Sequence, residues 1–127
     1  MKLTLKDFEL LFPDLEKVLG FYKDTLGLPL RFRNETFADF DLGYGSRLAL
    51  WEVKHAGETC GESSVNPVGN RMMASFRLKS KEALLQTYKE FRQKKVNLIQ
   101  PAQSWPWGKY AFYFKDPNDY LWEVYAL

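Results

Sequence analysis

The chain of 127 residues is poor in the residue types that disulfide and metal chemistry need. It has one cysteine, Cys60, which excludes an intrachain disulfide and a thiolate metal cluster. It has one histidine, His55, so any site built on two histidines would have to take one from a second chain. Without disulfides, a reducing compartment, the cytoplasm, is the expected location.

Long apolar runs and a strong excess of one charge are also absent. No run approaches the roughly 18 apolar residues of a membrane span, and we expect neither a signal peptide nor a membrane partner. The formal net charge of +2 argues against nucleic-acid binding, which requires clustered basic residues. Aromatic residues, in contrast, make up 17% of the chain. The length suffices for one domain with a core that buries about two-thirds of the unfolded surface.

An internal repeat organises the sequence. The tetrapeptide Leu-Trp-Glu-Val at 50–53 recurs 71 residues later at 121–124. The tripeptide Tyr-Lys-Asp at 22–24 returns 66 residues later as Tyr-Lys-Glu at 88–90. Two echoes in the same order, at similar offsets, predict two copies of one structural unit.

The first copy is predicted as strand, helix and three strands. Residues 2–12 form the first strand candidate, Asp14 is a suitable helix N-cap, and Gly27 suits the end of the helix. Between them, apolar residues recur at helical spacing. Three runs typical of strands follow, at 29–33, 36–42 and 47–53.

Residues 54–70 are polar and without periodicity, which predicts a linker between the copies. His55 and Cys60 fall in this segment, and we interpret them as linker residues rather than as a catalytic pair.

In the second copy, Ser80 is the expected helix cap. The other elements predicted there are strands at 72–79, 97–100, 109–115 and 120–126, with a long loop at 101–108.

The pattern predicts an α+β fold of two βαβββ modules. Module one spans 1–53, the linker 54–70 and module two 71–127, within a single domain. Each module would have a curved mixed sheet with its helix on the outer face. The free sheet faces would then form a cup, in one chain or across a dimer.

Two motifs resemble those of the vicinal oxygen chelate superfamily. One is Gly-Phe-Tyr-Lys-Asp-Thr-Leu-Gly at 20–27, and the other is Phe-Lys-Asp-Pro-Asn-Asp-Tyr-Leu-Trp-Glu at 114–123. The family includes glyoxalase I, extradiol dioxygenases, fosfomycin-resistance enzymes and bleomycin-resistance binding proteins. Asp119 stands where the family commonly has a glycine, so we expect Asn118 or Asp119 to adopt a positive φ.

The resemblance also implies where a metal would bind. The family's four ligand positions map onto Asp7, Glu52, Met73 and Glu123, and both histidines are therefore missing. Such a set does not suit Zn²⁺ or Fe²⁺, which favour imidazole. We expect no cofactor; a metal, if one were bound, would use Asp7, Glu52 and Glu123.

A ligand site is predicted from strand alternation and from the aromatic loop. Alternation predicts Leu50 and Glu52 on the open face of one strand and Glu123 on that of another, with Trp51 and Trp122 under the helices. The predicted ligand-binding residues are Asp7, Glu9, Leu50, Glu52, Met73, Trp105, Trp107, Tyr110 and Glu123.

Three functions are compatible with this sequence. The leading hypothesis, by analogy with the bleomycin-resistance branch, is metal-free binding of a small aromatic or cationic molecule such as an antibiotic. The second is a glyoxalase-type lyase, isomerase or dioxygenase that uses a divalent metal. The third is a non-catalytic dimeric module. A homodimer is expected in each case, with or without exchange of modules, and the balance favours a protein that is not an enzyme.

Overall fold

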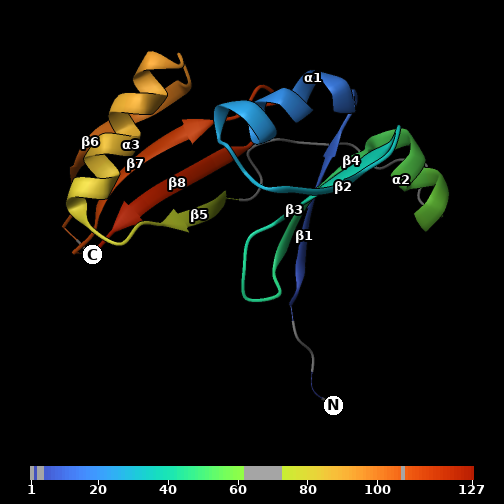
Figure 1. The fold of residues 1–127 in the computed structure, drawn as a ribbon, viewed down its shortest axis with the longest axis horizontal. Helices are drawn as coiled ribbons and strands as arrows, with labels where there is room; N and C mark the ends of the chain where they lie inside the picture. Colours follow the sequence, from blue (N-terminus) through green and yellow to red (C-terminus); the bar gives the residue numbers. More distant parts are fainter. Residues whose placement is uncertain (1, 3–4, 62–72, 107) are drawn as a thin grey trace. The chain divides into compact units, whose positions relative to one another are not determined.

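The computed structural model describes residues 2, 5–61, 73–106 and 108–127 (Figure 1). The chain divides into two compact units, residues 1–67 and 68–127. Predicted residue Trp107 and most of the predicted linker lie outside the described residues. No described helix is long and apolar enough to cross a membrane.

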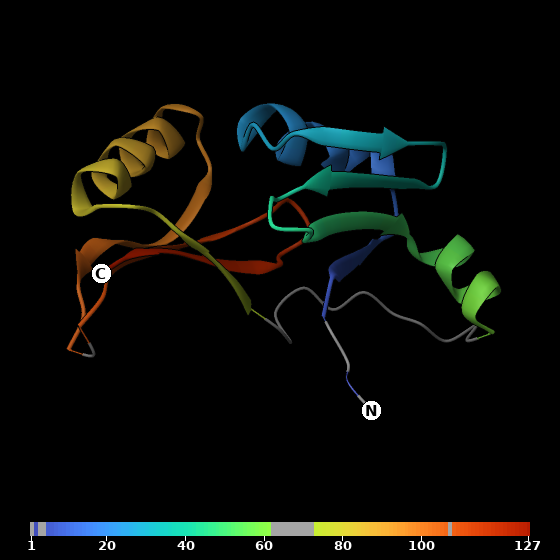
Figure 2. The same cartoon turned by 60° about the horizontal axis from the view of Figure 1, so that its bottom comes forward.

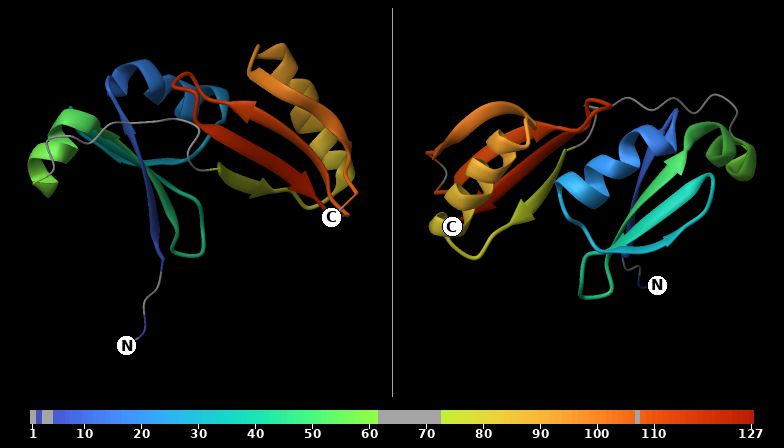
Figure 3. Two further views of the ribbon diagram at one scale, coloured as in Figure 1. Left: turned by 180° about the vertical axis from the view of Figure 1, so that it is seen from behind. Right: turned by 45° about the horizontal axis from the view of Figure 1, so that its top comes forward.

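The first unit contains one mixed four-stranded sheet. Its strands lie in the order β1-β4-β3-β2, with β1 parallel to β4 and the other pairs antiparallel. Its elements are β1 (Asp7–Phe12), α1 (Leu15–Gly20), the π-helix η1 (Phe21–Thr25), β2 (Leu30–Arg33), β3 (Phe37–Asp41), β4 (Arg47–Glu52) and α2 (Val53–Cys60). The helix α1 lies against this sheet (Figure 3).

The second unit repeats this topology. The order is β5-β8-β7-β6, again with the first strand parallel to the last and the other pairs antiparallel. Its elements are β5 (Met73–Arg77), α3 (Lys81–Gln93), β6 (Asn97–Ser104), β7 (Tyr110–Lys115) and β8 (Leu121–Ala126). Figure 2 shows α3 across one face of the sheet. The predicted α+β fold with mixed βαβββ sheets is confirmed, whereas the cup remains a prediction.

Aromatic side chains build the core of each unit between helix and sheet. In the first unit Tyr22 is fully buried, with ring centroids 6.2 Å from Phe12 and 6.4 Å from Phe40. In the second unit Phe91 of α3 packs edge-to-face on Phe112, at 5.6 Å. The apolar face of each helix thus packs on the strand residues that point toward it, and this packing stabilises each unit.

Several predicted local features are confirmed. The Ser80 hydroxyl accepts from the Ala83 amide at 3.1 Å and caps α3. Gly27 has a φ of 69° and Asp119 a φ of 66°, as the helix end and the turn require. Asp14 stands at the N-cap of α1, but its side chain makes no capping hydrogen bond, which corrects that expectation.

Two segments predicted to be irregular are regular. Residues 53–60 form α2, because the Glu52 carboxylate accepts from the His55 amide at 2.6 Å and caps a helix that the polar composition concealed. Strand β6 continues to Ser104, four residues further than predicted. It includes Pro101, which an edge strand tolerates because no neighbour needs its missing N–H.

The repeated tetrapeptide does not occupy equivalent positions in the two sheets. Trp122 pairs with Phe114 on the face covered by α3, as predicted. Trp51 pairs with Phe37 and Leu11 on the face away from α1, so its predicted place under the helix is wrong. Leu50 pairs with Leu10 and is fully buried on the α1 face, where the sequence had predicted an open face. The register of a strand in its sheet determines which face each of its residues occupies, and the tetrapeptide does not encode that register.

We expect Phe112→Ala to lower the free energy of unfolding by about 3–5 kcal/mol, because its fully buried ring contacts Tyr88 and Phe91 of α3. Urea unfolding followed by circular dichroism measures the change. Leu85→Ala, on the same helix but 41% exposed, is the control and should change stability by about 0.5 kcal/mol or less. Equal losses in the two variants would contradict the assignment of this core.

Candidate functional site

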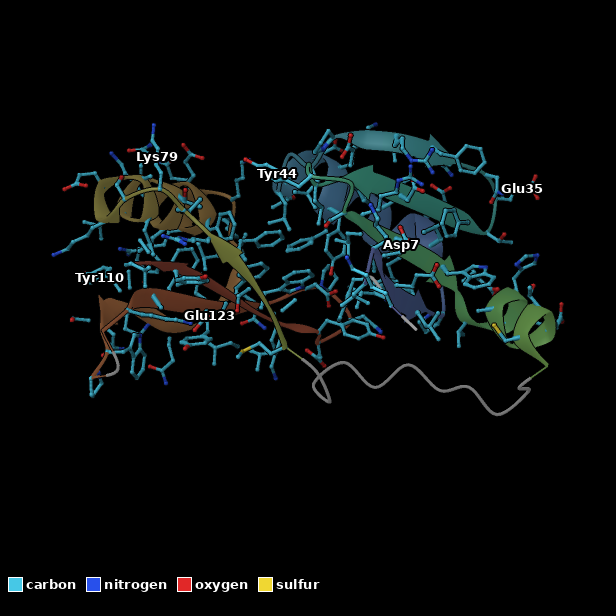
Figure 4. The ribbon with its side chains drawn as sticks, turned by 90° about the horizontal axis from the view of Figure 1, so that it is seen from below. Asp7, Glu35, Tyr44, Lys79, Tyr110 and Glu123 are labelled. Atoms are coloured by element: carbon cyan, nitrogen blue, oxygen red, sulfur yellow. The ribbon has the colours of Figure 1, made fainter. Side chains whose placement is uncertain are left out.

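A buried carboxylate marks the face of the second sheet that α3 leaves uncovered. Glu123 is 4% exposed and lies on the central strand β8 (Figure 4). Its register partners are Ser75 on β5 and Tyr113 on β7, and cross-strand partners point to the same side of a sheet. Trp122 and Val124, its neighbours in sequence, point to the α3 side and are buried there. Alternation therefore sets Glu123 on the uncovered face, as predicted.

Each oxygen of this carboxylate accepts a hydrogen bond from a hydroxyl group. Ser75 Oγ donates to Oε1 at 2.7 Å, and Tyr113 OH donates to Oε2 at 2.7 Å. The Lys109 ammonium group lies 3.6 Å from Oε1. These partners supply what burial of a charged group requires.

The two ionisable groups at the centre have opposite pKa shifts relative to their exposed values. Burial raises the pKa of Glu123, but the hydrogen bonds from Tyr113 and Ser75 and the charge of Lys109 outweigh it, so the net pKa is lowered. Burial, with the hydrogen bond to Glu123 and the charge of Glu123, raises the pKa of Tyr113 to about 12. At neutral pH the site therefore holds an ionised carboxylate and a protonated phenol.

Lys109 lies between a negative charge and an aromatic ring. Its Nζ is 4.1 Å from the centroid of the Tyr125 ring and 3.6 Å from Glu123 Oε1. The lysine side chain is 32% exposed, whereas the Glu123 side chain is 6% exposed. The face thus already binds one ammonium group by ion pairing and a cation–π contact.

Trp105 extends this face beyond the carboxylate. Its ring lies edge-to-face on Tyr113 with centroids 5.9 Å apart, and its Nε1 donates to the Ala111 carbonyl at 3.2 Å. Tyr110 instead pairs with Ala126 on the α3 side, with Lys81 Nζ 4.6 Å above its ring. The structure therefore brings Trp105 to the Glu123 site and directs Tyr110 away from it.

The predicted residues of the other strands fall in three different places. Asp7 (Figure 4) and Glu9 are exposed on the face of the first sheet away from α1, as predicted. Glu52 pairs with Phe12 on the α1 side and caps α2, so its predicted place on the open face is wrong. Met73 is 48% exposed and pairs with Leu121, on the same side of the second sheet as Glu123.

These residues do not fit the metal that the family resemblance implies. Asp7 pairs with Arg47, five residues before Glu52 on β4, so the two carboxylates lie about 17 Å apart along the strands. A cation at Glu123 would have to displace a hydroxyl donor and to lie near the Lys109 ammonium group. Among the described residues, no three His, Cys, Asp or Glu side chains are placed to hold an ion.

His55 and Cys60 both lie on α2. His55 Nδ1 accepts from the Trp51 indole N–H at 3.0 Å, and Cys60 is an exposed free thiol at the end of the helix. Positions five apart on a helix point in different directions, so the two side chains do not form a nucleophile and base. The interpretation against a catalytic pair agrees with this geometry, although the two residues belong to a helix.

Sequence reasoning missed three partners of Glu123: Ser75, Tyr113 and Lys109. The alternation in 110–115 carried a signal for Tyr113, because Ala111 and Tyr113 share one face while Phe112 and Phe114 share the other. That Tyr113 meets Glu123 depends on the pairing of β7 with β8, and Ser75 depends on the non-local pairing of β5 with β8. Neither pairing can be read from local periodicity.

Comparison with known proteins identifies the family of this chain. The model of the Glyoxalase/Bleomycin resistance protein/Dioxygenase superfamily matches residues 4–124. The uncharacterized protein YraH of Bacillus subtilis (strain 168) is 31% identical over 129 residues, covering 98% of this chain and 99% of YraH. The crystal structure of a glyoxalase/bleomycin resistance protein/dioxygenase from Nocardioides has a TM-score of 0.86 and 32% identity, covering 99% of this chain and 84% of that chain. Lactoylglutathione lyase from Agrobacterium tumefaciens, at 19% identity, a TM-score of 0.80 and coverage of 97% and 92%, shares the fold.

We expect Tyr113→Phe to lower the free energy of unfolding at pH 7 by about 1–3 kcal/mol, since it removes a hydrogen bond to a buried charge. The lowered pKa of Glu123 stabilises the fold above the ordinary carboxylate pKa of about 4.3, and that contribution is lost as the pH falls through the lowered value. Because the variant raises the pKa of Glu123, its stability should fall less on acidification. Urea unfolding between pH 7 and pH 3 measures both effects.

Tyr125→Phe is the matched control, because it removes a hydroxyl group from the same face and keeps the ring beneath Lys109. It should retain the pH dependence of the unsubstituted protein. A Tyr113→Phe protein with unchanged stability and an unchanged pH dependence would contradict the described role of this hydrogen bond.

Proposed function

Because the chain belongs to the Glyoxalase/Bleomycin resistance protein/Dioxygenase superfamily, we propose that it binds a small aromatic cation, such as a cationic antibiotic, without metal chemistry. The proposed site is the uncovered face of the second sheet around Glu123. Binding alone sequesters the ligand, and no bond of the ligand is broken.

The observation that carries this proposal is the place of the Lys109 ammonium group. It lies 3.6 Å from a buried, ionised carboxylate and 4.1 Å from the Tyr125 ring centroid, as an ammonium group of a bound ligand would. Lys109 is partly exposed and its side chain is flexible, so a ligand cation can replace it at Glu123. The displaced lysine regains hydration, which limits the cost of the exchange.

Aromatic residues near Glu123 provide the contacts for the ring of the ligand. Trp105 and Tyr113 are in contact, and the indole N–H of Trp105 is anchored on the Ala111 carbonyl. A ring already held by protein contacts loses little conformational entropy when a planar ligand packs on it. Each aromatic or cation–π contact contributes roughly 0.5–2 kcal/mol, so three of them supply about 1.5–6 kcal/mol of the roughly 8 kcal/mol that micromolar binding requires, and the ion pair with Glu123 adds to this.

The donor set supports binding over the glyoxalase-type alternative. In this chain the two family histidine positions hold Asp7 and Met73, and Glu52 is engaged in capping α2. The lactoylglutathione lyase comparison concerns the fold alone and does not extend to its reaction. The third alternative, a module without a ligand, is an outcome of the binding experiment below.

We also propose that two chains pair as a homodimer. The described residues leave large apolar side chains exposed in one chain, among them Phe32 at 47% and Met73 at 48%. We expect sedimentation velocity to give a mass near twice 14.9 kDa at micromolar concentration. A single species at the monomer mass up to about 100 μM would overturn this part of the proposal.

The experiment titrates the protein with aromatic antibiotics that carry an ammonium or amidinium group, and with uncharged aromatic analogues of similar size. Isothermal titration calorimetry gives affinity, and tryptophan emission reports contact with the indoles. We expect at least one cationic compound to bind, and its uncharged analogue to bind more weakly. If no compound binds at millimolar concentration, the proposed function is wrong and the module without a ligand is favoured.

Glu123→Gln should weaken binding of a cationic ligand about 10- to 100-fold, because it removes the negative charge from the site. Lys109→Ala should leave the affinity unchanged or increase it, because it removes the competing ammonium group. Glu82→Gln, an exposed change of equal charge on α3, is the control and should have no effect. Weaker binding in Lys109→Ala, or unchanged binding in Glu123→Gln, would contradict the proposed exchange.

A further inference from the structure

One flank of α3 carries a hollow that takes no part in the Glu123 site. The hollow has a volume of about 360 Å³ and is lined by four side chains of this helix, Tyr88, Lys89, Arg92 and Gln93. Helix α3 covers one face of the second sheet (Figure 2), and Glu123 lies on the other face. Pockets of roughly 300–1,000 Å³ accommodate small organic molecules. The α3 hollow is therefore a separate candidate site in the same unit.

Helical spacing brings the side chains of the hollow together. Residues four apart lie side by side on a helix, so Tyr88 adjoins Arg92, and Lys89 and Gln93 form a second such pair. The Tyr88 residue is half-buried, and its ring packs on Phe112 with centroids 5.2 Å apart. The other three residues are exposed. The hollow thus has an anchored aromatic ring on its inner side and accessible polar groups on its outer side.

The segment that contains the hollow is strongly basic. Residues 88–95 hold four basic side chains and one acidic side chain, namely Lys89, Arg92, Lys94, Lys95 and Glu90. Their formal net charge of +3 exceeds that of the whole chain, which is +2, so the remainder of the chain is slightly negative. The carboxylate of Glu90 already accepts a hydrogen bond from the Gln86 amide at 3.2 Å. Positive charge is therefore concentrated at this end of α3.

The two cations of the hollow have no anionic partner in the part of the chain that the structure describes. No described carboxylate lies within ion-pair distance of Lys89 or Arg92. Capping of the helix does not occupy them either, because backbone amides bond the last carbonyl groups. The amides of Lys94 and Lys95 donate to the carbonyls of Glu90 and Arg92, at 2.9 Å and 3.1 Å. Both charged groups are thus available to a ligand.

An anion with several acceptor oxygens matches the donors of the α3 hollow. The Arg92 guanidinium group presents a planar fork of N–H groups that suits bidentate binding of phosphate. Lys89 adds an ammonium group, and the Tyr88 hydroxyl and the Gln93 amide add uncharged donors. A phosphate monoester carries about −1.5 to −2 charges at pH 7, which two cations balance. A carboxylate carries only one.

We propose that the α3 hollow binds a small aryl phosphate. Arg92 and Lys89 bind the phosphate oxygens, and the aromatic group of the ligand packs against the Tyr88 ring. Because Phe112 holds that ring in place, little side-chain freedom is lost when the ligand packs on it. The site takes an anion and shares no residue with the Glu123 site, which takes a cation under the proposed function.

The probe is phenyl phosphate, and two analogues each lack one of its features. Phenyl sulfate keeps the ring but carries a single charge, whereas inorganic phosphate keeps the charge but has no ring. We expect phenyl phosphate at low salt to shift the backbone amide resonances of residues 88–93 with a Kd of about 1 mM or lower, and each analogue to bind about fivefold more weakly or less tightly still. Acidification from about pH 7.5 to pH 5 should weaken phenyl phosphate, whose second pKa is about 6, and leave phenyl sulfate unchanged.

Substitutions of exposed residues test the assignment with little risk to the fold. Arg92→Gln should weaken phenyl phosphate about fivefold or more, and Arg92→Lys should lose part of that affinity because it keeps the charge without the planar fork. Lys94→Gln is the matched control, because it removes the same charge from the basic segment but does not line the hollow. It should change affinity about twofold or less.

Three results would overturn this inference. The first is the absence of saturable shifts in residues 88–93 at 20 mM phenyl phosphate. The second is equal weakening in Lys94→Gln and Arg92→Gln, which would mean diffuse attraction to the basic segment rather than a site. The third is a set of shifts confined to β5 and β8. Each of these outcomes leaves the proposed function to its own test, because that test uses cationic ligands and variants of Glu123 and Lys109.

Discussion

A carboxylate buried on the central strand of a sheet needs a donor for each oxygen, and the open face of the second unit is organised by this requirement. Glu123 obtains its donors from Ser75 on β5 and Tyr113 on β7, so the hydrogen bonds join all three strands. Lys109 then neutralises the charge and lies over Tyr125. A polar network completed in this way rigidifies the face on which it lies. It also positions Trp105, whose ring lies edge-to-face on the Tyr113 ring.

The first unit has the same topology and meets this requirement differently. Its buried carboxylate, Asp39, has one ion pair through Oδ2, and none of the residues that the structure describes donates to Oδ1. The register explains the difference, because the position on β4 that corresponds to Glu123 on β8 is Ala49. In the second unit the carboxylate stands on the central strand between two hydroxyl groups, whereas in the first it stands on β3 beside an arginine. Both faces present negative charge next to aromatic rings.

Alternation along a strand can be predicted, but the pairing between strands cannot. The sequence correctly set Glu123 on one face of β8 and Trp122 on the other, because that prediction needs only the period of two. The same reasoning failed for Leu50 and Trp51, since an identical tetrapeptide stands in a different register in β4. It also missed α2, whose start depends on one hydrogen bond from the His55 amide to Glu52. Composition does not report such a contact.

The sequence by itself determined the βαβββ order of each unit, the residues that end its helices and turns, and the family, because these depend on local periodicity and on short motifs. Gly27 and Asp119 are examples, each with the positive φ that its local sequence implied. Only the tertiary structure decided which polar groups meet. Ser75 reaches Glu123 across 48 residues of chain, and Arg31 reaches Asp39 from a neighbouring strand with an irregular register. The physical reason is that a buried charge is stabilised by whichever donors the strand pairing delivers, and that pairing is a property of the whole sheet.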